Sequence, residues 1–308
     1  MSIMVWGHRG HRHYRHSSYT RPPHENSAAA YEFALRQTMG LECDVVQSKQ
    51  GTPYLIHDTL FDGIVKYEMG HHLQPASRDI LGDKLIYQME DEALGKIKLS
   101  DGQPLPKLWD LLMLMPRFPG RVLNLELKGP NTVDVAIRTV ERAIQQKLVT
   151  PQQIVFSSFN LPALRHLRIN AGYRFKIGAL FTLVGQPMAQ MYPNWPNAEP
   201  DAYYIPFDPS VVERSDVREI DPDFFNLERG SVDLNALNVL EHHYPKAKII
   251  LWTAGEPHPT ENTLLVDTVV ELAWTNRLYA VASDFPEVIQ KQLIARGVAV
   301  KTPHPDYF

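Results

Sequence analysis

The strongest constraint on the fold is a repeated alternation of short apolar strand patterns with helical patterns along almost all of the 308 residues. Such alternation is typical of a parallel sheet covered by helices. The strand patterns of the repeat are 3–8, 41–46, 121–127, 153–158, 176–181, 202–206, 247–252 and 278–283. The helical patterns are 27–39, 107–115, 132–147, 161–170, 232–243 and 286–296. Eight strand–helix units need about 250 residues and favour closure into a barrel. We therefore predict an α/β fold, a single (β/α)8 TIM-barrel domain over residues 1–308.

A further strand pattern, at residues 53–57, follows the second strand too closely for a helical crossover. The two strands are therefore expected to form an antiparallel hairpin that turns near Gln50 and Gly51. Residues 58–106, which follow this early hairpin, are too many for a simple loop and are interpreted as an insertion over the barrel mouth. A solvated elaboration without a role in chemistry is the alternative.

Composition narrows the classes of function and location. The formal net charge of −4 argues against nucleic-acid binding through bulk positive charge. The single cysteine, Cys43, excludes an intrachain disulfide, so nothing requires an oxidising compartment. The N-terminal residues lack the basic and long apolar segments of a secretory signal. No run approaches the ~18 apolar residues of a membrane-spanning helix. We expect a cytoplasmic, soluble protein without stable membrane insertion.

One strand pattern separates apolar from polar side chains with unusual clarity. In the segment 122–128 (Val-Leu-Asn-Leu-Glu-Leu-Lys), the three leucines line one face and Asn124, Glu126 and Lys128 line the other. The leucine face is expected to pack against helices, so the polar face should look into the barrel. Charged groups there are costly to bury unless they are paired or bind a metal.

Three carboxylates are predicted to point into the barrel near the carboxyl ends of its strands, where active sites of this fold form. Glu42 and Asp44 are two residues apart on the second strand, and Glu126 lies on the segment described above. An all-oxygen set suits one hard divalent cation, Mg²⁺ or Ca²⁺. The alternative is a buried ion network in which Glu126 pairs with Lys128 and Arg9.

Polar residues at other predicted strand ends suit the chemistry of a phosphodiester. His8 and His57 end predicted strands and are expected to lie near the carboxylates, and histidine can remove or deliver a proton near neutral pH. Arg9 and Lys128 suit phosphate recognition, Arg9 through a planar fork and Lys128 as a point charge. Trp252 ends another strand, where it would contact an apolar part of a substrate or fill the barrel end as a core aromatic.

These residues occur in short motifs whose order resembles the glycerophosphodiester phosphodiesterase family. The motifs are His8-Arg9-Gly10, Pro23-His24-Glu25-Asn26-Ser27, Glu42-Cys43-Asp44-Val45, His57-Asp58, Glu126-Leu127-Lys128, Ser158-Phe159, Trp252-Thr253 and Asp284-Phe285-Pro286. The chain departs from the family pattern at His24, which is inserted, at Gln50, which replaces an Asp, and at Glu256, which stands near a usual Asn. None of these departures touches the carboxylates or His8 and His57, so they bear on substrate preference more than on catalysis.

The resemblance implies a barrel with an insertion after the His57-Asp58 motif, metal ligation by the three carboxylates, and catalysis by His8 and His57. Arg9 and Lys128 would hold the phosphate, and Glu25 would lie near the metal and the arginine. The implied activity is metal-dependent hydrolysis of a small-molecule glycerophosphodiester to glycerol 3-phosphate and an alcohol, with His57 provisionally the acid. Two alternatives remain, a lysophospholipase D-type enzyme that forms a cyclic phosphate and a barrel that binds a phosphorylated ligand without turnover.

Overall fold

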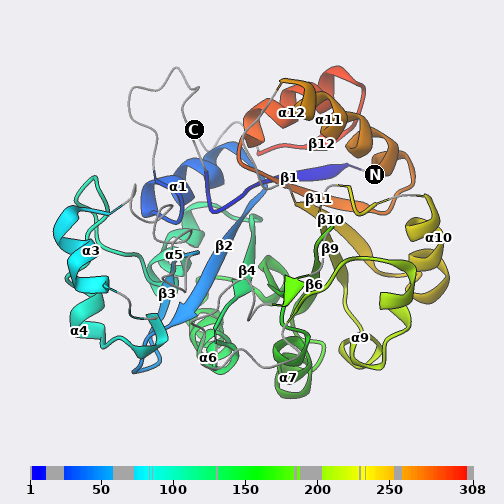
Figure 1. The fold of residues 1–308 in the computed structure, drawn as a ribbon. Helices are drawn as coiled ribbons and strands as arrows, with labels where there is room; N and C mark the ends of the chain where they lie inside the picture. Colours follow the sequence, from blue (N-terminus) through cyan, green and yellow to red (C-terminus); the bar gives the residue numbers. More distant parts are fainter. Residues whose placement is uncertain are drawn as a thin grey trace.

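The computed structural model describes residues 2–11, 24–57, 73–82, 84, 86–129, 131–183, 186–187, 203–228, 230–232, 234–252 and 259–303. Its centre is a closed barrel of parallel strands surrounded by helices (Figure 1). In order around the barrel the strands are β1 (Ile3–Gly7), β2 (Gly40–Gln47), β4 (Val122–Leu127), β5 (Ile154–Ser158), β6 (Lys176–Phe181), β9 (Phe224–Glu228), β10 (Lys248–Trp252) and β11 (Leu278–Ser283). Pairing of β1 with both β2 and β11 closes the barrel, and β12 (Val300–Lys301) adds a short parallel pairing to β1. The predicted (β/α)8 fold is confirmed.

Helices cover the outside of the barrel, and the six that were predicted begin and end close to the predicted positions. The helices are α1 (Ala28–Gln37), α5 (Leu108–Leu114), α6 (Thr132–Gln145), α7 (Leu161–Ala171), α9 (Ser215–Ile220), α10 (Leu234–His243), α11 (Pro259–Trp274) and α12 (Pro286–Ala295), with short 3-10 turns η2 (Met115–Arg117), η3 (Pro151–Gln153) and η4 (Pro209–Glu213). Ser27 caps α1 by accepting a hydrogen bond from the amide of Ala30, as short hydroxyl side chains do at helix starts. Helices α9 and α11 were not predicted. No helix in the described parts of the chain combines the length and apolar character needed to span a bilayer.

The sixth barrel strand differs from the predicted one. The segment 202–206 was expected to enter the barrel, but β8 (Tyr203–Tyr204) instead pairs with β7 (Gln186–Pro187) in a separate two-stranded antiparallel sheet. Strand β9 takes the barrel position between β6 and β10. Pro206 has no backbone N–H, so a strand through it cannot complete both ladders of a central sheet position, whereas β9 contains no proline.

The predicted antiparallel hairpin is confirmed. Strand β3 (Pro53–Leu55) pairs antiparallel with β2, with Val46 opposite Tyr54. Gly51 has φ of +82° in the connecting turn, a conformation that glycine adopts without steric cost. The described part of the insertion forms α3 (Pro75–Leu81), η1 (Ile86–Gln88) and α4 (Asp91–Leu94) beside β3 (Figure 1). It has its own apolar cluster, built on Val46 and Tyr54 of the hairpin.

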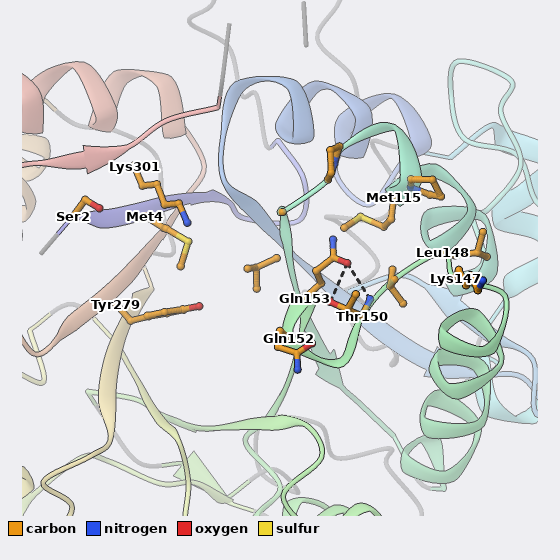
Figure 2. A pocket seen from close by; sticks show the side chains of 15 residues that line it. Ser2, Met4, Met115, Lys147, Leu148, Thr150, Gln152, Gln153, Tyr279 and Lys301 are labelled. Atoms are coloured by element: carbon orange, nitrogen blue, oxygen red, sulfur yellow. Dashed lines mark hydrogen bonds between the residues drawn. The ribbon is translucent and has the colours of Figure 1, made fainter. Parts of the chain in front are cut away.

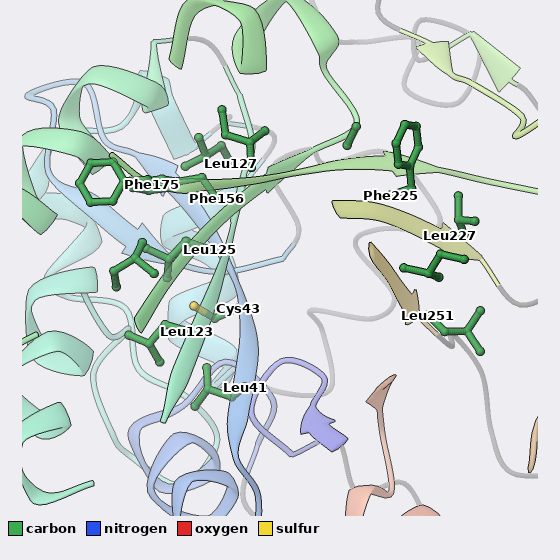
Figure 3. Packing of buried hydrophobic residues seen from close by; sticks show 14 of the residues in the cluster. Leu41, Cys43, Leu123, Leu125, Leu127, Phe156, Phe175, Phe225, Leu227 and Leu251 are labelled. Carbon is green, nitrogen blue, oxygen red and sulfur yellow. The ribbon is translucent and has the colours of Figure 1, made fainter. Parts of the chain in front are cut away.

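The main core lies between the barrel strands and the surrounding helices, as the leucine face of the segment 122–128 predicted. Figure 3 shows the side chains that face outward from neighbouring strands in this cluster, including Leu41, Cys43, Leu123, Leu125, Leu127 and Phe156. Residues at alternate positions of the same strands therefore point into the barrel. This alternation places Glu42, Asp44 and Glu126 on the inner face.

Candidate active site

Three carboxylates meet at the end of the barrel where the parallel strands finish. Glu42 and Asp44 on β2 and Glu126 on β4 each offer an oxygen, and these oxygens lie within 4.8 Å of one another. The register of the two strands brings Asp44 directly opposite Glu126. Glu42 and Asp44 are buried, and the Glu126 side chain is mostly so. This compact, buried set of oxygen ligands fits a hard divalent cation.

The negative charge of Glu42 is poorly compensated within this set of carboxylates. Burial raises the pKa of Glu42 well above its usual range, and the charges of Asp44 and Glu126 raise it further. The Oε1 atom of Glu42 is buried and has no hydrogen-bond partner among the described residues. An uncompensated buried carboxylate oxygen is costly. A bound cation would remove this cost, so the residues present fit a metal.

Basic side chains lie close to Asp44 and compensate its negative charge. Nζ of Lys128 lies 2.8 Å from Oδ1 of Asp44 and 3.4 Å from Oε1 of Glu126, and Nε of Arg9 lies 3.7 Å from Oδ2 of Asp44. Burial by itself would raise the pKa of Asp44, but the charges of Lys128, His57 and Arg9 hold it well below its usual range. The ion pairs considered from the sequence thus exist beside the carboxylate set, centred on Asp44 more than on Glu126.

A tight turn after β1 places His8 and Arg9 next to the three carboxylates. A side chain at Gly7 would clash with the backbone, because its Cβ would lie 1.7 Å from the carbonyl oxygen of Gly10. Arg9 has φ of +51°, a left-handed conformation that is strained for this residue. Its amide donates to Oε2 of Glu42 at 2.9 Å. The strain is consistent with a turn whose shape serves the site.

The histidine of the turn is held by a carboxylate from the last barrel strand. Nδ1 of His8 donates to Oδ1 of Asp284 at 2.6 Å, and Nε2 lies 3.7 Å from Oε2 of Glu42. Both His8 and Asp284 are buried. Asp284 was noticed only as part of a motif, and its contact with His8 could not be inferred because 276 positions separate them in the sequence.

The segment before α1 supplies two further polar residues. Nη1 of Arg9 donates to Oε1 of Glu25 at 2.9 Å, in agreement with the position expected for Glu25 beside the arginine. Nδ2 of Asn26 donates to Oδ2 of Asp44 at 2.9 Å, and the hydroxyl of Tyr31 donates to Oδ1 of Asn26 at 2.8 Å. Asn26 was not predicted as a site residue, although its place directly after Glu25 in the motif was a signal for it.

His57 follows β3 and lies on the same side of the barrel as the carboxylates. Its carbonyl oxygen accepts a hydrogen bond from Nζ of Lys128 at 3.4 Å, and its charge lowers the pKa of Asp44. The structure therefore brings His57, Lys128 and Asp44 together, as expected. Asp58, the second residue of the His57 motif, lies outside the described residues.

Aromatic side chains occupy another part of the barrel mouth. The indole of Trp252, at the end of β10, lies edge-to-face against Phe159 with ring centroids 5.7 Å apart. Its Nε1 donates to the carbonyl oxygen of Asn226 at 3.3 Å. Trp252 is half-buried, which is compatible with both roles considered for it from the sequence. Thr253 and Glu256 lie outside the described residues.

A cavity of about 830 Å³ lies at the opposite end of the barrel (Figure 2). Met4 and Tyr279 come from the beginnings of β1 and β11, and Lys147 and Lys301 also contribute to the lining. The side chains that line it include no carboxylate and no histidine. The cavity therefore lacks the groups on which the chemistry predicted above depends, and the candidate site is the carboxylate set at the other end.

Comparisons with known proteins give a family match and a group of similar folds. Residues 8–278 match the model of the glycerophosphoryl diester phosphodiesterase family. The fold resembles an Oleispira antarctica phosphodiesterase in complex with the product sn-glycerol-3-phosphate (20% identity, 95% of this chain, 97% of that chain, TM-score 0.63). It also resembles a glycerophosphodiester phosphodiesterase from Parabacteroides distasonis (17% identity, 96% of this chain, 98% of that chain, TM-score 0.60). A glycerophosphodiester phosphodiesterase from Thermotoga maritima is similar as well (20% identity, 94% of this chain, 98% of that chain, TM-score 0.58). No curated protein sequence matches the chain. The family match covers most of the chain and includes the carboxylate set, so the chain belongs to the glycerophosphoryl diester phosphodiesterase family.

Proposed function

We propose that the chain hydrolyses glycerophosphodiesters to glycerol 3-phosphate and an alcohol in a metal-dependent reaction. The observation that carries the proposal is the compact set of Glu42, Asp44 and Glu126, with oxygens within 4.8 Å, beside the buried His8–Asp284 pair. Family membership supports the reaction class. The glycerol 3-phosphate product in the Oleispira antarctica relative supports the product.

Glu42, Asp44 and Glu126 would hold one divalent cation, Mg²⁺ or Ca²⁺, since all three ligands are carboxylate oxygens. The bound cation would supply positive charge against the negative charge that develops on the phosphoryl oxygens. Arg9 and Lys128 would add two more positive charges next to the same position. Glu25 fixes the direction of the Arg9 guanidinium through the 2.9 Å contact. Together these groups would orient the phosphate within the barrel mouth.

His8 and His57 would carry the proton transfers. Because Nδ1 of His8 donates to Asp284, its Nε2 is left to face the site and exchange a proton with the attacking or leaving oxygen. The charge of His57 reaches Asp44, which supports a place for it at the same phosphate. We assign His57 as the acid on the leaving oxygen and His8 as the base or nucleophile.

Trp252 and Phe159 would contact the apolar part of the substrate, because their rings pack together at the mouth. The insertion at 58–106 would shape access from the side of β3, on which its described part packs. The family is defined by its glycerophosphodiester activity, so the reaction itself would not depend on these two regions. The aromatic pair and the insertion would instead determine which alcohol group the substrate carries.

The test is turnover of glycerophosphocholine by the purified protein, followed by phosphorus NMR with and without a chelator. Glycerol 3-phosphate that forms only with cation present is the expected result, whereas a cyclic phosphate would indicate the lysophospholipase D-type reaction. Ligand binding without any product would indicate a barrel that only binds. The double substitution His8→Ala/His57→Ala should abolish turnover, and His166→Ala on exposed α7 is the matched control. Undiminished turnover in the double variant would overturn the assignment of the two histidines.

A further inference from the structure

The interior of the barrel beneath the carboxylates is unusually polar. Inward side chains of a (β/α)8 barrel form layers of four from alternate strands. The strand register places Trp6, Asn124, Gly178 and Ile250 in one layer and Glu42, Ser157, Asn226 and Ala282 in the next layer toward the mouth. Glu42 therefore lies between the other two carboxylates, Asp44 and Glu126, above it and the layer of Trp6 and Asn124 below it.

Besides Oε1 of Glu42, four polar atoms of these two layers have no hydrogen-bond partner among the residues that the structure describes. They are Nε1 of Trp6, Oδ1 of Asn124, Oγ of Ser157 and Oδ1 of Asn226. The four residues are between 0% and 3% exposed. Buried polar groups in native proteins are almost always hydrogen-bonded, to protein or to ordered water. Four such atoms in adjacent layers therefore point to a partner that the described side chains do not supply.

The chemistry of the four atoms identifies that partner. The indole of Trp6 can only donate, the amide oxygens of Asn124 and Asn226 can only accept, and the hydroxyl of Ser157 can do both. A ligand that satisfies them must be a donor and an acceptor, and it must be small. Ser157 and Ala282 are the small side chains of the Glu42 layer, while Met4, Val122 and Phe224 belong to an apolar cluster below it. Water meets each of these requirements.

We propose that Trp6, Asn124, Ser157 and Asn226 form an internal water-binding chamber, and that its water hydrogen-bonds to Glu42 from beneath. A carboxylate oxygen has two lone pairs, so Oε1 of Glu42 can face a cation and accept from water at the same time. The four residues are then positioning residues for a metal ligand. Groups in this position commonly tune metal affinity without touching the metal. The effect on the metal rests on the proposed function, whereas the binding of water does not.

The first experiment tests the water alone. In the ¹⁵N-labelled wild-type protein, magnetisation transfer from water to the indole N–H of Trp6 is measured, and Trp6→Phe identifies its signal among the five tryptophans. A long-lived water contact at this buried proton is the expected result. Contacts to protein protons only, with no transfer from water, would overturn the chamber.

The second experiment tests the positioning role by calorimetric titration of the folded protein with Mg²⁺ and with Ca²⁺. Ser157→Ala removes the hydroxyl that shares a layer with Glu42 and should weaken cation binding about 10-fold. Ile250→Val is the matched control, because it removes one methyl from the layer of Trp6 without removing a polar atom, and its affinity should stay at the wild-type value. Equal affinity in both variants would overturn the positioning role. If the wild-type protein binds no cation, the metal site and the positioning role are both wrong, while the NMR measurement still decides the chamber.

Discussion

The two ends of the barrel are built from the same strands but differ in what their inward side chains do. On β1 the inward residues pass from Met4 at the beginning of the strand to Trp6, and His8 follows at the end. On β4 they pass from Val122 through Asn124 to Glu126. Every second side chain of each strand points inward, and along each strand the chemistry of these inward side chains changes from apolar to charged. On these two strands, therefore, the inward charged groups lie at one end of the barrel and the inward apolar groups lie at the other.

The apolar end, which we call the floor, is a continuous cluster of buried side chains. It comprises Met4, Trp6, Met39, Val122, Val155, Phe224, Ile250 and Ala280. Tyr279 covers it from outside, with its ring 4.6 Å from that of Phe224, and borders the cavity of Figure 2. Burial of this much apolar surface stabilises the folded chain.

The charged end, which we call the mouth, works against stability. Arg9 holds a left-handed backbone conformation, and Glu42 keeps a raised pKa because it is buried beside two other carboxylates. Strain and buried charge of this kind persist only where the surrounding structure enforces them. The difference between the two ends implies that substitutions at the mouth change catalysis and those at the floor change stability.

The largest expected effect is at Asp44. Asp44→Asn removes a proposed metal ligand and the partner of Lys128 and Asn26, and kcat/KM for glycerophosphocholine should fall by about 10³-fold or more. Far-ultraviolet circular dichroism should still show the folded barrel. Asp134→Asn, on the exposed surface of α6, is the matched control and should keep wild-type activity. A loss of less than about 10-fold in kcat/KM for Asp44→Asn would show that the carboxylates at the mouth do not carry the reaction.

The opposite result is expected at the floor. Ile250→Ala should lower the free energy of unfolding by about 2–5 kcal/mol, because it opens a cavity in the inner layer, and kcat should be unchanged where the variant is folded. Denaturant unfolding and turnover at the same temperature measure the two quantities. Ile169→Ala, 70% exposed on α7, should shift stability by no more than about 0.5 kcal/mol. A fall in kcat without a change in stability would break the division between the two ends.

The same division explains what could be predicted from the sequence. Alternation along β2 and β4 is a local property, so the inward direction of Glu42, Asp44 and Glu126 was predictable from residue spacing. The hairpin was predictable because the gap before residue 53 is too short for a crossover. Strand β9 was missed because Tyr203, Tyr204 and Ile205 have the stronger strand composition, and only barrel closure selects between the two segments.

Contacts between distant parts of the chain could not be predicted. The His8–Asp284 pair joins the first strand to the last, and it exists only because β11 returns beside β1. Helix α11 escaped prediction because its sequence is rich in threonine and valine, which favour strands. Local propensity decided neither case; the closed barrel did.

A smaller effect on catalysis is expected at the carboxylate that holds the histidine. Asp284→Asn keeps the volume but removes the charge that fixes the Nδ1–H tautomer of His8, so kcat should fall about 10–100-fold with little change in KM. Glu287→Gln is the matched control, since Glu287 contacts His11, a second buried histidine among the described residues, at 3.1 Å. If both substitutions lower kcat equally, a general effect of buried histidine–carboxylate pairs explains the loss, and Asp284 has no special role.

The smallest expected effect is a change in stability at Glu42, and its sign tests whether this carboxylate destabilises the fold. The folded-state pKa of Glu42 is raised, so in the chelated protein its contribution to stability is present at low pH and is lost as pH rises from about 4.5 through that pKa. Glu42→Gln should therefore raise the Tm of the chelated protein at neutral pH and flatten its dependence on pH. Glu141→Gln, on the exposed face of α6, should change neither.

Addition of a divalent cation should reverse the order of the two proteins. The wild-type protein should gain about 2.7 kcal/mol when the cation is at 100 times its Kd, and the Glu42→Gln variant should gain much less because a ligand is missing. Thermal unfolding with chelator and with cation measures both states. A variant that is less stable than wild type in chelator would mean that the fold already compensates the Glu42 charge. In that case Glu42 would not destabilise the fold, and the proposed division between a mouth that serves chemistry and a floor that serves stability would be wrong at this residue.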